Sequence, residues 1–209
     1  MTKVLLIRHG ETVWNLEGRI QGSLDSPLTA LGRAQAEALG AQLAREALDA
    51  LHASDLGRTR QTTDPISSAT GLAAVFDSAW RERNYGDWEG RVYAEIKRDF
   101  PEEYERILHR DEHAAAPNGE SAAQFQKRIV AALTRLARAK NGRRIAVVTH
   151  GGVLGTMYRY VNGLTLDAPR NYTIANASIN RLHFDGSAWS VESWGEVAHL
   201  GAQGADIPH

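Results

Sequence analysis

The chain has 209 residues, of which 43% are hydrophobic and 23% charged, and its formal net charge is −1. These are ordinary globular values, and the length suffices for one α/β domain with a substantial core. The near-neutral charge argues against nucleic acid or an anionic membrane as a partner, and no apolar run approaches the length of a membrane span. Because cysteine is absent, disulfides, thiolate nucleophiles and cysteine-ligated metals are excluded.

The chain shows no sign of division into parts. It leads directly into an apolar segment without the basic and apolar stretches of a secretory signal, which predicts a cytoplasmic protein. No repeat, linker or low-complexity stretch is visible, so we expect a single domain over residues 1–209. Residues 201–209 are expected to form a loose tail.

Apolar runs alternate along the chain with Ala- and Leu-rich segments that begin at a capping residue. This alternation predicts an α/β fold, a three-layer α/β/α sandwich with a mainly parallel central sheet. The expected elements, in chain order, are a strand over residues 3–7, a helix from its N-cap Thr29 to Ala44, a strand over 50–53, a helix capped by Ser54 or Asp55 that runs through Ser68, a strand over 73–76, a helix from Ser121 to Ala139, a strand over 144–148 and a helix over 152–160.

Two segments depart from this alternation. Residues 178–184 and 187–194 are separated by Asp185-Gly186, which is typical of a hairpin, and we expect it at one edge of the sheet. Pairing of this hairpin with a second copy, giving a homodimer, is left open. Residues 87–118, which we call the lid, carry many charges and the aromatic residues Tyr93, Phe100 and Tyr104. They predict short helices that cover a functional site.

The most informative motif is Arg8-His9-Gly10-Glu11-Thr12, directly after the first predicted strand. The glycine marks a turn, so the arginine and the histidine stand at the carboxyl end of a strand, where open α/β sheets bind their ligands. A guanidinium beside a ring nitrogen suits an anionic substrate that a histidine attacks. Taken alone, a histidine at a strand end is more often a hydrogen-bonded structural residue.

Three further motifs follow in order: SDLGRTRQT at 54–62, RERNYGDWEG at 81–90 and THGG at 149–152. Together the four motifs resemble the histidine phosphatase superfamily, the phosphoglycerate-mutase-like proteins, from Val4 to about Leu200. The resemblance implies that a histidine takes a phosphoryl group from a small-molecule phosphate ester.

The resemblance implies that His9 is the nucleophile and forms a phosphohistidine that water later hydrolyses. Its attacking nitrogen must be unprotonated, and Arg8 and Arg58 should disfavour the imidazolium while binding phosphate through their planar donor groups. The other ring nitrogen must donate to a fixed acceptor, which we expect to be a backbone carbonyl in the following turn. His150 should donate to a phosphoryl oxygen, and Gly151 should offer a backbone N–H at a helix start.

Glu82 is the expected general acid and then general base, provided that its pKa is raised. Glu89 competes for this role, but the family motif has the acid before the Gly-x-Trp-Glu-Gly turn, which fits Glu82. Arg81 and Arg83 would lower the pKa of Glu82 if they pointed toward it, so we expect them to face elsewhere.

Residues of the loop after the first strand complete the expected site. Asn15 matches a family position that contacts the phosphate, and Thr12, Gln21 and Gly22 are further candidates. The remaining histidines are interpreted as structural or exposed, and these are His52, His109, His113, His183, His199 and His209. Four tryptophans are interpreted as packing residues, with Trp88 also at the border of the pocket, and these are Trp80, Trp88, Trp189 and Trp194.

A metal site is the main chemical alternative. No His-Glu-x-x-His or clustered carboxylate motif appears in the sequence, and Gly10 and Gly32 do not build a glycine-rich loop that ends in Gly-Lys. We therefore expect no metal ligands and no cofactor.

Two features favour a phosphatase over a cofactor-dependent phosphoglycerate mutase. Mutases of this family resemble Tyr-Gly-x-Leu-Gln-Gly, whereas this chain reads YGDWEG at 85–90. In addition, only 36 residues separate Glu82 from Gly119, where the mutases usually carry a much longer insertion. A non-catalytic phospho-ligand binding module is a further alternative, but such proteins usually lose the nucleophile or the acid. The substrate stays open among phosphoglycerates, sugar phosphates, phosphoserine and the phosphorylated nucleoside of cobalamin assembly.

Three positions depart from the usual family pattern. Asn118 stands where glycine is common, Trp80 where leucine is common, and Trp194-Gly195-Glu196 where the family often has Trp-Asn-Asp. None belongs to the expected chemical groups, and whether they change the pocket and hence the substrate is left open.

Overall fold

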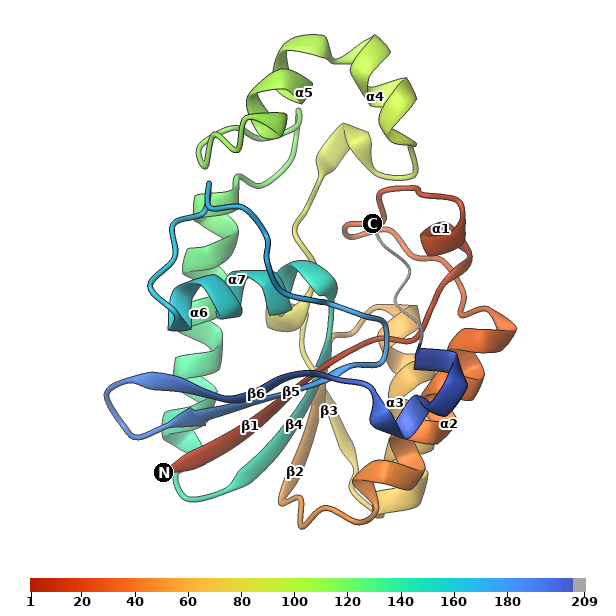
Figure 1. Cartoon of the computed structure of the whole chain (residues 1–209), viewed down its shortest axis with the longest axis vertical. Coiled ribbons are helices and arrows are strands. Elements are labelled where there is room, and N and C mark those ends of the chain that lie inside the picture. The colour runs from red at the N-terminus through yellow and green to blue at the C-terminus, as the bar shows by residue number, and fades with distance from the viewer. Residues whose placement is uncertain (205–209) are drawn as a thin grey trace.

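The computed structural model describes the backbone of residues 1–204 and the side chains of residues 1–201 (Figure 1). Six strands of this described part form one sheet in the order β3-β2-β4-β1-β5-β6. The bounds are β1 Thr2–Arg8, β2 Ala50–Ala53, β3 Ala74–Phe76, β4 Arg144–Thr149, β5 Ile179–Phe184 and β6 Trp189–Glu196. The first four strands pair in parallel, whereas β5 runs antiparallel to both β1 and β6.

The α-helices of the described residues are α1 Val13–Leu16, α2 Ala30–Leu43, α3 Gly57–Thr70, α4 Tyr93–Asp99, α5 Pro101–Leu108, α6 Ala122–Ala139 and α7 Gly151–Val161. Short 3-10 segments occur at Ser78–Trp80, Gly86–Trp88 and Ala198–Gly204. Two expected helix caps are confirmed, because the Thr29 hydroxyl accepts the Gly32 N–H and the Ser121 hydroxyl accepts the Gln124 N–H.

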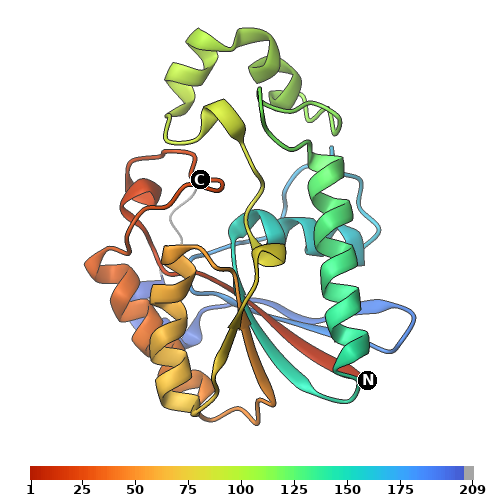
Figure 2. The same ribbon diagram turned by 180° about the vertical axis from the view of Figure 1, so that it is seen from behind.

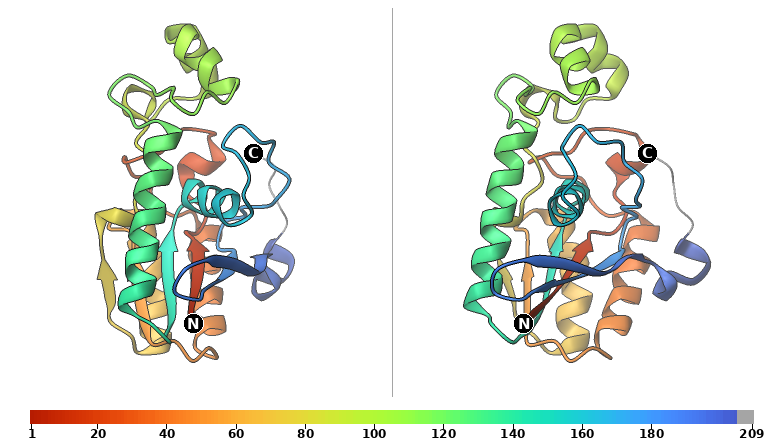
Figure 3. Two further views of the ribbon diagram at one scale, coloured as in Figure 1. Left: turned by 90° about the vertical axis from the view of Figure 1, so that its left-hand side faces the viewer. Right: turned by 60° about the vertical axis from the view of Figure 1, so that its left-hand side comes forward.

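Helices cover both faces of the sheet, which confirms the predicted three-layer α/β/α sandwich. On β1, Val4 and Leu6 pack in one cluster with α6 and α7, whereas Leu5 and Ile7 pack in another with α2 and α3. Successive side chains of a strand point to opposite faces of the sheet, so β1 contributes residues to both hydrophobic cores. Figure 3 shows the sheet between α6 and the pair α2 and α3.

The register of the two central strands brings the sequence motifs together. Arg8, the last residue of β1, lies opposite Thr149, the last residue of β4. Because both strands end at the same level, His9 and His150 follow at adjacent strand ends. The carboxyl edge of the parallel strands is therefore where the expected site must form.

The start of α3 differs from the sequence expectation. The sequence predicts Ser54 or Asp55 as its cap, but the helix begins after Leu56, which makes no side-chain capping bond. Instead, the carboxylate of Asp25 accepts the backbone N–H of Arg58 at 3.1 Å. A loop distant in sequence thus supplies the negative charge at this helix start.

The predicted hairpin is present as β5 and β6 at one edge of the sheet. The expected loose tail is wrong at its start, because the 3-10 segment Ala198–Gly204 includes residues 201–204. Residues 205–209, and with them His209, lie outside the described residues. Within the described part, no helix combines the length and apolar character needed to cross a membrane.

The lid contains α4 and α5, and the segment after β3 climbs from the sheet to reach it (Figure 2). Its own small core consists of Trp88, Ile96 and Ala116 together with Ile20 from the loop after β1. Ile20 and Gly90 are also joined by a backbone hydrogen bond of 2.7 Å. The lid is therefore anchored on the loop that follows the first strand.

The structure accounts for the three departures from the family pattern. Asn118 adopts φ +61°, which asparagine tolerates better than most residues, and its amide donates to Asp87. Trp80 is buried in the core cluster of α6 and α7. Glu196 pairs with Arg181 at 3.0 Å on the edge hairpin. Of the three departures, only Asn118 lies in the lid.

Candidate active site

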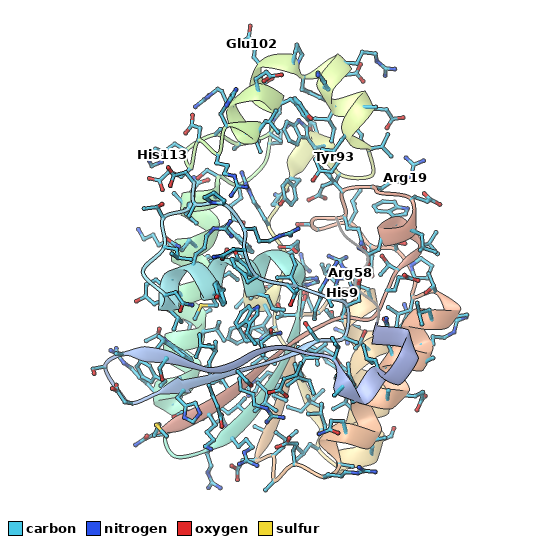
Figure 4. The ribbon with its side chains drawn as sticks, viewed as in Figure 1. His9, Arg19, Arg58, Tyr93, Glu102 and His113 are labelled. Carbon is cyan, nitrogen blue, oxygen red and sulfur yellow. The ribbon has the colours of Figure 1, made fainter. Side chains whose placement is uncertain are left out.

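A cavity of about 730 Å³ lies at the carboxyl ends of β1 and β4. Its wall comes from the end of β1, the loop after β1, α3, α6, α7, the lid and the loop between α7 and β5. Most of the predicted site residues line it, and these are Arg8, His9, Asn15, Gln21, Gly22, Arg58, Glu82 and Gly151. Figure 4 shows His9 next to Arg58, with Tyr93 of the lid above them.

The ring of His9 is fixed in the tautomer that a nucleophile needs. Its Nδ1 lies 2.8 Å from the carbonyl oxygen of Gly10, which can only accept, so Nδ1 carries the hydrogen. The expected backbone acceptor is therefore the next residue. Burial lowers the pKa of His9 well below 6.5, and the nearby Arg58 and Arg8 cations lower it further. Nε2 is left unprotonated.

His150 is fully buried and is not among the residues that line the cavity, but its ring contacts that of His9, with the two centroids 5.4 Å apart. Burial first, and then the Arg58 cation, hold the pKa of His150 well below 6.5. Its Nε2 lies 2.9 Å from the hydroxyl of Ser54, and its buried Nδ1 has no hydrogen-bond partner within the described structure. A hydroxyl that donates to Nε2 leaves the hydrogen on Nδ1, where it can serve an anion.

Arg58 is almost completely buried and is held in place by the loop after β1. Its Nη1 donates to the carbonyl of Leu24 at 2.7 Å and its Nη2 to the carbonyl of Gly22 at 2.8 Å. Nη1 also lies 3.2 Å from the carboxylate of Asp25. The buried Nε has no partner within the described part of the chain, so one donor of this cation is unsatisfied. Arg8 donates through Nη1 to the carbonyl of Ile174 at 2.5 Å.

Glu82 lines the cavity and is held by two backbone groups. Its Oε1 accepts the N–H of Arg83 at 2.9 Å, and its Oε2 accepts the N–H of Gly152 at 2.8 Å. A Cβ atom on Gly152 would come within 2.1 Å of Oε1. The second glycine of the THGG motif is therefore what lets α7 approach this carboxylate.

Arg128 of α6 fixes the main chain around Glu82. Its guanidinium donates to the carbonyls of Ala79, Arg81 and Glu82, each at 3.2 Å. Two further bonds of 3.0 and 2.9 Å join it to the carboxylate of Glu120. This cation holds the segment from which the proposed acid projects, although no sequence motif pointed to it.

Glu89, the competing carboxylate, is engaged elsewhere. Its Oε1 accepts the backbone N–H groups of Ser23 at 2.8 Å and Tyr85 at 3.0 Å, and its Oε2 accepts that of Leu24 at 3.1 Å. Gly22, with φ +53°, packs so closely that a Cβ would lie 2.1 Å from Oε1 of Glu89. Glu89 therefore ties the loop after β1 to the start of the lid, which leaves Glu82 as the carboxylate of the cavity.

The two arginines beside Glu82 face differently. Arg81 forms a bidentate pair with Asp55, both bonds being 2.6 Å, and so points away as expected. Arg83 was expected to face elsewhere but lines the cavity. Its Nε donates to the carbonyl of Glu120 at 2.7 Å and its Nη2 to that of Ala114 at 3.0 Å. Its position is set by these two carbonyls of the chain that returns from the lid.

Asn15 and Thr12 act as a unit at the start of α1. The hydroxyl and the N–H of Thr12 both donate to Oδ1 of Asn15, at 3.0 and 3.1 Å. Asn176 also donates to this oxygen and to the carbonyl of His9. Because Oδ1 is occupied, the amide N–H₂ of Asn15 is the group that can meet an anion. Thr12 is fully buried, and its hydroxyl positions Asn15.

Several cavity residues carry no motif and escaped sequence analysis. Arg159 is the one with a recoverable signal, since it follows Gly151 by eight residues on the same helix and so shares its face. Two others stand on short helices, Trp14 on α1 and Tyr93, already noted among the lid aromatics, on α4. The remaining ones lie outside the α-helices, and these are Arg19, Arg110, Arg170 and Tyr172. Trp14 therefore borders the pocket, whereas Trp88 is buried in the lid core.

The remaining described histidines lie outside the cavity lining. His183 pairs with Glu192 at 2.6 Å, and His199 meets the carbonyl of Ala177 at 3.0 Å. His52 is buried on β2, and His109 and His113 are exposed. Among the described residues, no group of three or more histidine, aspartate or glutamate side chains could hold a metal ion.

Comparisons with known proteins agree with this geometry. Residues 4–197 match the sequence model of the histidine phosphatase superfamily (branch 1). Over 205 residues the chain is 36% identical to a protein of Yersinia enterocolitica named probable phosphoglycerate mutase GpmB, which covers 96% of this chain and 95% of that protein.

Two solved structures are similar to this chain. YhfR of Bacillus stearothermophilus has a TM-score of 0.88 at 32% identity, over 96% of this chain and 100% of its own. A phosphoserine phosphatase of Entamoeba histolytica, in complex with 3-phosphoglyceric acid, has a TM-score of 0.86 at 28% identity, again over 96% and 100%. The protein belongs to the histidine phosphatase superfamily.

Proposed function

We propose that this protein is a metal-independent phosphomonoester hydrolase that acts on small phosphorylated metabolites through a phosphohistidine at His9. The observation that carries the proposal is the hydrogen bond of 2.8 Å from Nδ1 of His9 to the Gly10 carbonyl, which leaves Nε2 as an unprotonated nucleophile. The lowered pKa of His9 keeps it in that state near neutral pH. Arg8 and Arg58 supply the positive charge that binds the phosphate.

The reaction proceeds in two displacements. Nε2 of His9 forms a bond to phosphorus, the phosphorus–oxygen ester bond breaks, and Glu82 gives its proton to the leaving oxygen. Water then attacks the phosphohistidine and passes a proton to the Glu82 carboxylate, which releases inorganic phosphate and restores His9. The Nε hydrogen of Arg58 and the Nδ1 hydrogen of His150 stabilise the phosphoryl oxygens in both steps, since within the described residues both are buried donors without a partner.

Trapping of the phosphorylated enzyme tests this proposal. An aryl phosphate without added metal is mixed with the enzyme, quenched in alkali within the first turnover, and the intact mass and modified peptide are determined. We expect one phosphoryl group on the peptide that contains His9, lost on acid treatment. Replacement His9→Ala should abolish both trapping and phosphate release, whereas His183→Ala on the edge hairpin should change neither. Full turnover by His9→Ala would overturn the proposal.

A phosphoglycerate mutase is the second candidate, because the Yersinia relative carries that name. Incubation of 3-phosphoglycerate with and without a 2,3-bisphosphoglycerate primer separates the two functions. A phosphatase releases inorganic phosphate whether or not the primer is present. A mutase interconverts the phosphoglycerates, depends on the primer and releases little phosphate.

A further inference from the structure

The cavity carries far more positive charge than one phosphate requires. Although the formal net charge of the chain is −1, the described residues of the cavity wall include seven arginines and one carboxylate, Glu82. Arg8 and Arg58 serve the transferred phosphate. The other five arginines are Arg19, Arg83, Arg110, Arg159 and Arg170. Of these, Arg19 pairs with Glu17 at 2.6 Å. Like charges that converge on one cavity repel each other unless an anion enters, so this excess points to the ligand.

Helix α7 shows where a second anion would bind. Besides Gly151 and Gly152, its residues Gly155, Thr156 and Arg159 line the cavity, so one face of the helix runs along the wall. A Cβ on Gly155 would lie 3.6 Å from Nη1 of Arg159, so the guanidinium folds back beside Gly155. Gly155 is one turn, or roughly 6 Å, from the phosphate end of the helix.

Among the described residues, no acidic side chain neutralises the charge of Arg159. Nη1 bonds to the hydroxyl of Tyr172, Nη2 donates to the carbonyl of Ala168 at 3.1 Å, and the buried Nε has no partner in the described structure. Arg110 of the lid donates to the same carbonyl. Within the described residues, no carboxylate lies within ion-pair distance of Arg159 or Arg110. Neutral acceptors thus orient two cations and leave their charge for a ligand.

The contacts also explain how these residues meet. Arg110 follows α5 in the lid, and Ala168 belongs to the loop between α7 and β5. Tyr172 of the same loop stacks on Tyr158, with ring centroids 4.0 Å apart, and donates to the carbonyl of Gly155 at 3.1 Å. The loop is therefore held against α7, and it presents one carbonyl to both guanidinium groups.

We infer that the substrate carries a second anionic group, which Arg159 binds about one turn of α7 away from the transferred phosphate while Arg110 closes over it from the lid. The inference rests on the proposed function. Either a carboxylate or a second phosphate has the required chemistry, since both accept a guanidinium through two oxygens. A substrate in which three carbons or fewer join the two groups matches the spacing.

Matched pairs of phosphate esters test the inference on the full-length enzyme. The carboxylate pair is 3-phosphoglycerate and glycerol 3-phosphate, and the phosphate pair is propane-1,3-diol bisphosphate and its monophosphate. The readout is the ratio of kcat/KM within each pair. We expect a ratio on the order of tenfold to a hundredfold in at least one pair, and that pair identifies the second group.

Variants assign the preference to Arg159. Arg159→Gln should bring the ratio close to one, and Arg159→Lys should retain part of it because the charge stays. A general structural defect lowers both members of a pair equally and leaves the ratio intact. The control Arg135→Gln, an exposed position on α6, should keep the wild-type ratio.

The outcomes separate this inference from the proposed function. Hydrolysis of all four esters with ratios near one would overturn the inference and leave the hydrolase intact, as would a preference that survives in Arg159→Gln. Absence of phosphate release from every ester, and from an aryl phosphate, would overturn the proposed function itself.

Discussion

The central sheet and the lid hold their residues with very different amounts of packing. Two extensive clusters cover both faces of the sheet, whereas the lid has one cluster of four buried residues, and these are Ile20, Trp88, Ile96 and Ala116. The ion pairs of the lid, such as Arg91 with Asp99 at 2.9 Å, are partly exposed and contribute little stability.

The difference assigns separate tasks to the two regions. His9 and His150 stand directly on strand ends between the two large clusters, where their positions are over-determined. The lid contributes Tyr93 and Arg110 to the far part of the cavity. We therefore expect the reaction chemistry to depend on the sheet and substrate choice to depend on the lid. Four measurements test this separation of roles.

The largest effect should come from the carboxylate of the cavity. Glu82→Gln removes the proton donor and should lower kcat by about 10²- to 10⁴-fold while changing KM much less. Glu89→Gln, which only weakens the tie between the loop after β1 and the lid, should lower kcat less than about tenfold. Steady-state kinetics on one phosphate ester compare them, and equal losses in kcat would show that the acid is misassigned.

Replacing a buried isoleucine with alanine should destabilise the whole protein when the residue lies in the sheet core, but only the lid when it lies in the lid core. Ile96 in the lid and Ile145 in β4 are both completely buried, and replacing either with alanine should cost about 2–5 kcal/mol locally. Ile145→Ala should lower the global free energy of unfolding by that amount, because the sheet unfolds as a unit.

Ile96→Ala should instead act on the lid alone. Amide hydrogen exchange should show lost protection in α4 and α5 with β1 and β4 unchanged, together with a smaller decrease in Tm. If Ile96→Ala destabilised both regions equally, the lid would not be a separate unit.

Arg128 should affect the rate without affecting binding. Arg128→Gln frees the main chain around Glu82 and should lower kcat by about tenfold with KM nearly constant, whereas Arg128→Lys should recover part of the loss. Arg135→Gln, an exposed arginine on the same helix, is the control. A rise in KM with unchanged kcat would contradict a positioning role.

The last expected effect is a pH dependence of stability. Burial, with Arg58 next in importance, holds the pKa values of His9 and His150 well below 6.5, whereas in the unfolded chain both protonate near that pH. Below pH 6.5 these two histidines therefore bind protons in the unfolded state but not in the folded state. The free energy of unfolding then decreases as the pH decreases. Each of these histidines should contribute about 1.4 kcal/mol per pH unit in that window.

Urea unfolding at about pH 7 and about pH 5.5 measures this dependence. His150→Gln should flatten it, because one buried imidazole is gone. His113→Gln should leave the slope unchanged, since that side chain is 75% exposed. Identical slopes in the wild type and His150→Gln would contradict the burial argument.

Much of the fold could be predicted from the sequence because it depends on interactions between residues close together in the chain. Periodicity and capping residues predicted the four parallel strands, the edge hairpin and the caps Thr29 and Ser121, since these depend on neighbours within a few residues. The placement of His9 and His150 at strand ends followed from the same patterns. Parallel pairing then brought them to one edge, with Gly10 as the local acceptor for His9.

Contacts between distant segments were decided only by the tertiary structure. Asp25 caps α3, Glu89 secures the loop after β1, and Arg128 braces Glu82 from another layer. Arg110 and Arg159 meet at one carbonyl of a loop that no motif marks. Local patterns determine which element a residue joins. The partner of a buried charge depends on how the elements pack against one another. That packing results from many weak contacts between segments across the whole chain, which local sequence patterns do not specify.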